Sequence, residues 1–304
     1  MLTFKQHLIE QELLNEKLLL INNGKKYGQI VFLAGGAGSG KGFAGSNFMN
    51  IQDYRVRDVD EMKLAYLKMN KLTHKYPELD GLNLKNPDDV FKLHTFVEKK
   101  GSIDATLKNM IKGMANPETL PNVVFDVTLK NIKKIDKTLP DLLAQGYKPE
   151  NIHIVWVLTD YKVAAKANLE RDRVVPAKVL LQTHEGAKDT MWGIVGKGNI
   201  PKNVNGGIYV ILNNRDQTVV FKSTDGKDFR SAKDDENAPV RKTTGGKKYS
   251  TDKDVKGEKT IIIKDFTYLT YKEPGKAPKN EKAIHDQLLR WVVKNAPKTD
   301  MILK

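Results

Sequence analysis

Residues 35–41 read Gly-Gly-Ala-Gly-Ser-Gly-Lys and directly follow an apolar run over residues 29–34. Two glycines with four residues between them, followed by lysine, have the spacing of a phosphate-binding P-loop. Glycines let successive backbone N–H groups approach phosphate oxygens, and the next helix adds the positive end of its dipole. A strand before the loop argues against a glycine-rich turn without function. The pattern predicts a nucleoside triphosphate site formed by Gly36, Ala37, Gly38, Ser39, Gly40, Lys41, Gly42 and Phe43.

One position departs from the usual loop, because Gly42 stands where Ser or Thr normally binds Mg²⁺. A Gly-Lys-Gly ending resembles adenylate kinase and other nucleotide kinases. Those enzymes continue with Thr, whereas this chain has Phe43. We therefore expect ATP as the nucleotide, and Mg²⁺ held by phosphates, waters and a carboxylate.

Carboxylates follow a short strand expected over residues 54–58. In an open α/β sheet this edge is where ligands bind, and a carboxylate there can accept a hydroxyl proton during phosphoryl transfer. Asp-x-Asp-x-x-Lys at this place resembles the zeta-toxin group of small-molecule kinases and the related polynucleotide kinases. That resemblance implies Asp60 as the catalytic base, Lys63 as a substrate or phosphate contact, and Asp58 as the alternative base. Otherwise both acids are an N-cap and a first-turn residue of the next helix.

A further carboxylate closes the apolar strand expected over residues 122–125. Asp126 there resembles the Walker B acid, or the Glu-x-Thr of zeta-like kinases that contacts substrate. The resemblance implies that Asp126 orients a Mg²⁺-bound water or the acceptor, with Thr128 as a further substrate contact. The alternative is that Asp126 caps a helix that begins near Asn131.

Two arginines lie in residues 168–176, where nucleotide kinases carry a lid over the triphosphate. The planar guanidinium of Arg binds two phosphate oxygens at once and stabilises the charge of transfer. Arg171 and Arg173 resemble that lid pair, and we count both as catalytic. Exposed arginines paired with Glu170 and Asp172 are the alternative.

Strand-like and helical patterns alternate along residues 25–196, which predicts an α/β fold. We expect a P-loop mononucleotide-kinase core in which helices cover both faces of a parallel sheet. The expected strands cover residues 29–34, 54–58, 122–125 and 152–158. The expected helices cover residues 43–49, 87 onward, 102–114, 132–144, 161–171 and 176–195, with a further helix from about residue 61. Residues 1–24 hold an amphipathic N-terminal helix pattern.

Residues 197–304 have a different character. Two apolar runs, 207–212 and 218–221, flank Asn-Asn-Arg-Asp and predict a β-hairpin. Residues 224–258 are almost wholly polar and predict a mobile loop or a disordered insert. With a last amphipathic helix over 281–293, this part is expected to form a smaller β-rich appendage on the core.

The composition narrows the function classes. The 304 residues carry a net charge of +14 and no cysteine, which excludes disulfides and thiolate metal sites. The charge favours an acidic partner, such as DNA or a nucleotide, although a lysine-rich solvated surface explains it equally. No apolar stretch reaches the ~20 residues needed to span a bilayer, and we expect a cytoplasmic protein without membrane contact.

These motifs together predict an ATP-dependent kinase that phosphorylates a hydroxyl. The charge favours a nucleic-acid or nucleotide acceptor, either a 5′-hydroxyl or a hydroxymethylated base of the type that some phage P-loop kinases modify. A zeta-toxin-like UDP-sugar kinase is the second interpretation. An ATP-binding interaction protein without catalysis is the third, because Gly42 and Phe43 depart from the active pattern.

Overall fold

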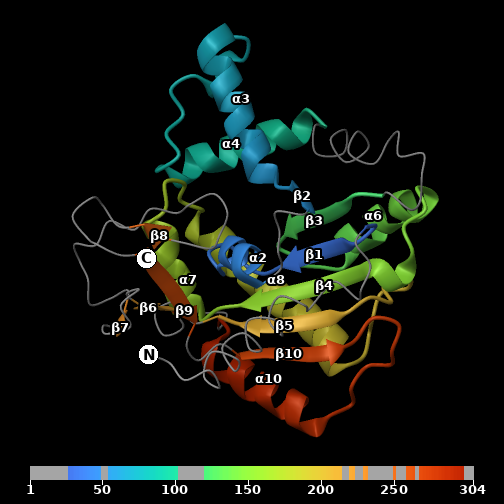
Figure 1. Ribbon diagram of the computed structural model, residues 1–304. Coiled ribbons are helices and arrows are strands. Elements are labelled where there is room, and N and C mark those ends of the chain that lie inside the picture. The colour runs from blue at the N-terminus through green and yellow to red at the C-terminus, as the bar shows by residue number, and fades with distance from the viewer. Residues whose placement is uncertain are drawn as a thin grey trace.

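Two β-sheets and their helices make up the part of the chain that the structure describes (Figure 1). The computed structural model describes residues 27–48, 54–101, 120–213, 219–222, 229–231, 249–250, 258–263 and 267–297. The helices expected within residues 1–24 and over 102–114 lie outside these ranges.

The main sheet has six strands in the order β10-β5-β4-β1-β3-β2. Their bounds are Ile30–Ala34 for β1, Tyr54–Arg57 for β2, Asn122–Val127 for β3, Ile152–Leu158 for β4, Ile208–Leu212 for β5 and Thr267–Lys272 for β10. Strands β1 to β5 run parallel, and β10 is antiparallel at the edge. The predicted α/β fold is confirmed, with one antiparallel strand added.

Helices cover both faces of this sheet because its strands are apolar on both sides. On one face, side chains such as Phe32 and Trp156 pack against α6 (Lys133–Ala144), α8 (Ala177–Met191) and α10 (Lys282–Asn295). On the other, Val31 and Leu33 pack with Ala44 of α2 (Lys41–Phe48). A π-helical turn, η5 (Trp192–Gly196), continues α8, and η4 (Pro149–Asn151) precedes β4.

A helical insert projects from the sheet between β2 and β3 (Figure 1). Its described part consists of α3 (Val59–Thr73), η2 (Pro77–Leu79) and α4 (Pro87–Lys99). Its small core includes Leu93 and a triad of edge-to-face rings, Tyr66, Tyr76 and Phe96. As predicted, Asn86 caps α4, and Pro87 follows in its first turn. The insert thus has apolar contacts of its own beside the edge of the sheet.

The predicted β-hairpin over 207–212 and 218–221 is wrong. β5 is buried along its whole length and pairs with β4 and β10, so it is an inner strand of the main sheet. The second run forms β6 (Val219–Lys222), which belongs to a separate antiparallel sheet in the order β7-β6-β9-β8. The main sheet therefore extends past the boundary expected at residue 196.

The other strands of the second sheet are β7 (Phe229–Ser231), β8 (Tyr249–Ser250) and β9 (Glu258–Ile263). Strands β7 and β8 lie within residues 224–258, and most of that expected loop falls outside the described residues. Across the described ranges, none of the helices combines the length and the apolar character needed to cross a bilayer.

Candidate nucleotide and phosphoryl-transfer site

The predicted phosphate loop lies between β1 and α2, which begins at Lys41. Gly38 and Gly40 have φ values of +74° and +86°, a left-handed conformation that glycine adopts without strain. The N–H of Ser39 bonds to the Gly36 carbonyl at 3.2 Å and closes the turn. Left-handed glycines in such a turn let successive N–H groups converge on an anion. The conformation suits the predicted triphosphate site.

Neighbouring elements hold the carbonyl groups of this loop. The Ser39 carbonyl accepts hydrogen bonds from Thr159 Oγ1 at 2.6 Å and Asn213 Nδ2 at 2.9 Å. The Ala37 carbonyl accepts one from His184 Nε2 at 2.7 Å. Residues at the ends of β4 and β5 and on α8 therefore hold the loop in shape.

Lys41 and Asp126 meet at the start of α2. Lys41 Nζ lies 3.6 Å from Asp126 Oδ1 and donates to the Gly35 carbonyl at 2.9 Å. The register of β3 against β1 sets this meeting, because it pairs Asp126 with Leu33. Burial raises the pKa of Asp126 above its ordinary value, and the Lys41 charge offsets part of that shift. The acid predicted at the Walker B position thus lies beside the P-loop lysine.

Asp126 also fits the expected Mg²⁺. Mg²⁺ is usually bound by one or two carboxylates together with substrate phosphates and waters, so one carboxylate beside a phosphate loop is sufficient. The Asp126 side chain is 26% exposed and open to such a ligand. Gly42 offers no hydroxyl, and nowhere in the described ranges do three or more His, Asp or Glu side chains form a metal cluster. The Phe43 side chain falls outside the described residues.

Asp60 is held by two cations at the start of the insert. Lys63 Nζ donates to Asp60 Oδ1 at 3.1 Å, and Arg173 pairs with both carboxylate oxygens. Although burial acts in the opposite direction, the charges of Arg173 and Lys63 lower the pKa of Asp60 below its ordinary value. Asp60 is therefore an anion at neutral pH, and its position joins the insert to the lid segment.

Asp58 has a structural role in this arrangement. Its side chain caps α3 by accepting a hydrogen bond from the Asp60 backbone N–H at 2.7 Å. The N-cap alternative is thus realised at Asp58, while Asp60 lies in the first turn with its side chain in the ion-pair cluster. Thr128 directly follows β3, and its role as a substrate contact stays a prediction.

The predicted lid segment is a loop between α7 (Tyr161–Leu169) and α8. The buried Asn168 side chain closes its base, since it donates to the Val175 carbonyl at 2.8 Å and accepts from the Val175 N–H at 3.0 Å. Lys85 Nζ donates to the Arg171 carbonyl at 2.6 Å and so ties the lid to the insert. The Arg171 guanidinium interacts electrostatically with Arg173 and with the carboxylates of Asp60, Asp126 and Asp58. The lid arginines and the carboxylates thus share one region.

Several residues of this region were not among the sequence predictions. Thr159 and Asn213 each follow a buried strand, the same signal that identified Asp126. For His184 the sequence offers a substrate contact and favours surface or core packing, and the structure buries this residue in the apolar stripe of α8. His94 of α4 interacts electrostatically with Lys63, Asp60 and Lys130, and its Nε2 lies 3.3 Å from Glu98 Oε1. Nothing in its sequence context distinguishes His94.

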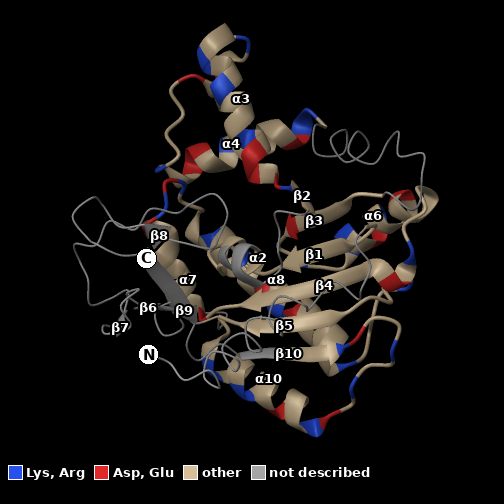
Figure 2. Ribbon diagram, viewed as in Figure 1, with Lys and Arg blue, Asp and Glu red and all other residues tan. Residues whose placement is uncertain are grey.

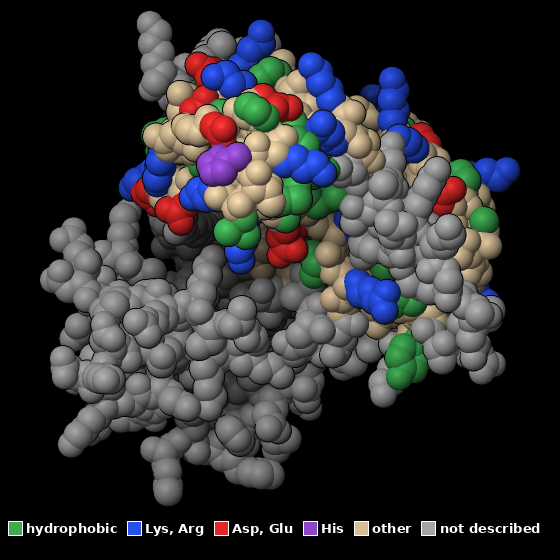
Figure 3. Space-filling model, turned by 90° about the horizontal axis from the view of Figure 1, so that it is seen from above, with side chains coloured by type: hydrophobic (Ala, Val, Ile, Leu, Met, Phe, Trp, Pro, Cys, Tyr) green, Lys and Arg blue, Asp and Glu red, His purple; other side chains and the backbone are tan. Residues whose placement is uncertain are grey.

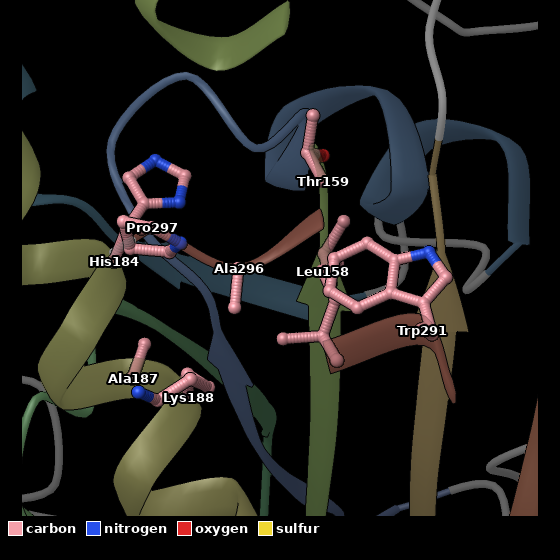
Figure 4. A pocket seen from close by; sticks show the side chains of 10 residues that line it. Leu158, Thr159, His184, Ala187, Lys188, Trp291, Ala296 and Pro297 are labelled. Atoms are coloured by element: carbon pink, nitrogen blue, oxygen red, sulfur yellow. The ribbon is translucent and has the colours of Figure 1, made fainter. Parts of the chain in front are cut away.

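A small pocket lies on the α8 side of the phosphate loop (Figure 4). Its walls come from the end of β4, from α8 and from the end of α10, and they include Thr159, His184 and Trp291. Its interior of about 10 Å³ has room for one water molecule. The pocket is therefore too small for a nucleotide, and the loop itself stays the predicted triphosphate site.

Comparison with known proteins finds structural matches and no sequence matches. No protein-family model matches the chain, and no curated protein matches it in sequence. The crystal structure of AvrRxo1-ORF1:-ORF2 with ATP matches with a TM-score of 0.41 and 13% identity, over 75% of this chain and 70% of that chain. A structure of the PezAT chromosomal toxin-antitoxin system of Streptococcus pneumoniae matches with a TM-score of 0.39 and 16% identity, over 68% and 76%. The P-loop kinase-like fold of this chain follows from its own sheet order and phosphate loop.

Proposed function

We propose that this chain is an ATP-dependent kinase that transfers the γ-phosphoryl group to a hydroxyl of a nucleotide or nucleic acid. The observation that carries the proposal is the meeting of two ion pairs at one edge of the sheet. Lys41 with Asp126 lies at the phosphate loop, and Asp60 with Arg173 joins the insert to the lid. Ligands of open α/β sheets bind at this edge.

The phosphate side of the reaction uses Lys41 and the lid. Lys41 Nζ donates to the Gly35 and Gly36 carbonyls, and the phosphates of ATP would offer it stronger, charged acceptors. Arg171 and Arg173 supply guanidinium groups for the charge on the transferred group. Mg²⁺ at Asp126 would neutralise part of that charge when it is bound. The chain thus provides cations for a triphosphate from two elements, α2 and the lid segment.

The acceptor side uses Asp60. In the transfer, the acceptor oxygen forms a bond to the γ-phosphorus, the bond to ADP breaks, and the hydroxyl proton passes to a base. Asp60 is ionised at neutral pH, so it can accept a hydrogen bond from the hydroxyl and take its proton. Arg173 must then share or release Asp60 as the phosphates arrive.

The nature of the acceptor rests on charge. The net charge of +14 favours a polyanion, which supports DNA or a nucleotide. In Figure 3, acidic and basic side chains share the described part of the face seen from above. That mixture favours a small acceptor between the insert and the lid, as in the UDP-sugar alternative. We therefore retain the nucleotide sugar as the second candidate.

The experiment is a transfer assay with γ-labelled ATP and a panel of acceptors: DNA with a 5′-hydroxyl, DNA with hydroxymethylated bases, nucleosides, nucleotides and UDP-sugars. Label in a nucleic acid or nucleotide supports the first candidate, and label in a UDP-sugar alone replaces it with the second. ATP binding without transfer to any acceptor favours the non-catalytic alternative. DNA affinity that falls steeply with salt would identify phosphate contacts.

Two variants test the assigned roles. Lys41→Ala removes the phosphate contact, and Asp60→Asn removes the base while keeping its size. Each is expected to lower kcat/KM by roughly a hundredfold or more. Because Asp60→Asn leaves the buried Lys63 without its carboxylate, Tm is measured alongside. Full activity in both variants would contradict the proposal.

A further inference from the structure

One helix, α8, touches the phosphate loop at its centre. His184 Nε2 donates to the Ala37 carbonyl at 2.7 Å, and Thr183 Oγ1 accepts from the Ala37 N–H at 3.4 Å. Consecutive residues of α8 therefore bind both backbone groups of one loop residue. The same helix starts directly after the lid, so loop and lid share one support.

The His184 ring is fixed on several sides. It is 6% exposed and meets the Tyr161 ring edge-to-face at 5.5 Å. A Cβ placed on Gly36 would lie 2.4 Å from the ring, so the loop can pass only because residue 36 is glycine. Figure 4 shows His184 beside the pocket that borders Thr159. Gly36 and His184 are thus a matched pair.

We propose that His184 is a positioning residue, which holds the phosphate loop in its ATP-binding shape by hydrogen bonding to Ala37 and packing on Gly36. This inference rests on the proposed nucleotide function and goes beyond it. A carbonyl oxygen only accepts, so Nε2 carries the hydrogen. Burial lowers the pKa of His184 to about 4, so the ring stays a neutral donor across the physiological range.

The role predicts which side chains can replace His184. In Gln, the amide nitrogen lies about where Nε2 lies, whereas the shorter Asn places its nitrogen nearer to Nδ1. His184→Gln should therefore keep the bond to Ala37, and His184→Asn should lose it. We expect ATP affinity within about threefold of the unmodified protein for His184→Gln and a loss of about tenfold for His184→Asn and His184→Ala.

The packing predicts a coupling between Gly36 and His184. Gly36→Ala should weaken ATP binding strongly, because its methyl group meets the ring. In the His184→Ala background the methyl group has room, so the same change should cost at least threefold less. A double-mutant cycle measures this difference directly. The exposed Gln182→Ala on the same helix is the control and should leave ATP affinity unchanged.

The measurement is equilibrium binding of labelled ATP with Mg²⁺, followed by steady-state kinetics where the acceptor is known. A positioning role raises KM for ATP and leaves KM for the acceptor unchanged. If the unmodified protein binds ATP and His184→Asn binds it equally well, the inference alone fails. If additive effects are found in the cycle, the packing argument fails. If the unmodified protein does not bind ATP, the proposed function fails as well.

Discussion

Arg173 holds Asp60 through both carboxylate oxygens, while Lys63 adds a third contact. A guanidinium has a rigid planar fork, and a lysine ammonium is a single point charge. The geometry at Asp60 therefore depends on arginine specifically. The Arg173 guanidinium is also proposed to bind the ATP phosphates. If it moves from the Asp60 carboxylate to the triphosphate, binding of ATP is linked to binding of the acceptor at Asp60.

Arg173→Lys tests this dependence. The charge stays, but the two parallel hydrogen bonds are lost, so we expect kcat to fall by roughly ten- to a hundredfold with Tm nearly unchanged. Initial rates at saturating ATP and acceptor measure it. The control is Lys92→Arg, an exposed residue of α4 paired with Asp89. Equal rates for Arg173→Lys and the unmodified protein would show that charge alone suffices.

Gly42 offers a second test at single-residue scale. It is exposed in the first turn of α2, and a Cβ placed on it meets nothing within 4 Å. Ser in place of Gly is favourable in a helix by roughly 0.5 kcal/mol, so Gly42→Ser should keep or slightly raise Tm. The new hydroxyl supplies the usual Mg²⁺ ligand, and we expect half-maximal activity at a lower Mg²⁺ concentration. An unchanged Mg²⁺ titration would place the metal away from residue 42.

At the scale of elements, close packing explains why α8 contains a glycine in its interior. Gly186 lies in the middle of the helix, where glycine costs about 1 kcal/mol relative to alanine. A Cβ there would lie 2.7 Å from the Lys130 carbonyl oxygen and from Lys130 Cβ. The glycine lets the helix approach the chain just beyond β3, where Leu129 has a φ of +45°. α8 therefore supports the end of β3 as well as the phosphate loop.

Gly186→Ala is expected to destabilise the protein. Helix propensity would favour alanine by about 1 kcal/mol, but overpacking against backbone costs 1–3 kcal/mol, so we expect a net loss of roughly 1 kcal/mol. Urea unfolding gives the free energy directly. The matched control is Gly193→Ala in η5, where nothing lies within 4 Å of an added Cβ. If both variants gained stability, the close packing at Lys130 would be contradicted.

The same elements show what the sequence could predict. The sequence predicts the phosphate loop because its residues are consecutive and follow a buried strand. It predicts a functional role for Asp126 because this acid closes an apolar run. The predicted hairpin is wrong because β5 pairs with β10, which begins only at Thr267, and not with β6, which is nearer in the sequence. The roles of His184 and Asn213 depend on distant backbone carbonyls, and no local spacing encodes such contacts.

At the scale of the whole molecule, charges lie mainly outside the sheet. Figure 2 shows Lys, Arg, Asp and Glu along α3, α4 and α10, while the strands of the main sheet are mostly uncharged. A polar side chain that is buried in the sheet needs hydrogen-bond partners there. His153 is fully buried, with Nε2 at 2.7 Å from Gln29 Oε1 and Nδ1 accepting from the Gly207 N–H at 2.8 Å. It joins β1, β4 and the start of β5.

This network makes the stability of the fold depend on pH. Burial, with a smaller contribution from the Lys272 charge, lowers the pKa of His153 to about 3, and burial lowers that of His184 to about 4. In the unfolded chain both titrate near 6.5, so between about pH 4 and 6.5 the unfolded state binds more protons. Stability therefore falls as the pH is lowered below 6.5. At pH 5 each histidine accounts for a loss of about 2 kcal/mol.

The expected result is a Tm that is steady from pH 7 to 8 and declines steadily from pH 6.5 to 5. His153→Gln keeps a donor for Gln29 but cannot be protonated, so its Tm should decline less steeply over the same interval. The lowered pKa of Asp60 acts only below about pH 4 and leaves this window unaffected. Calorimetry at pH 7, 6 and 5 compares the two proteins. Parallel declines would mean that His153 is already protonated within the folded sheet, and its two hydrogen bonds would have to be reassigned.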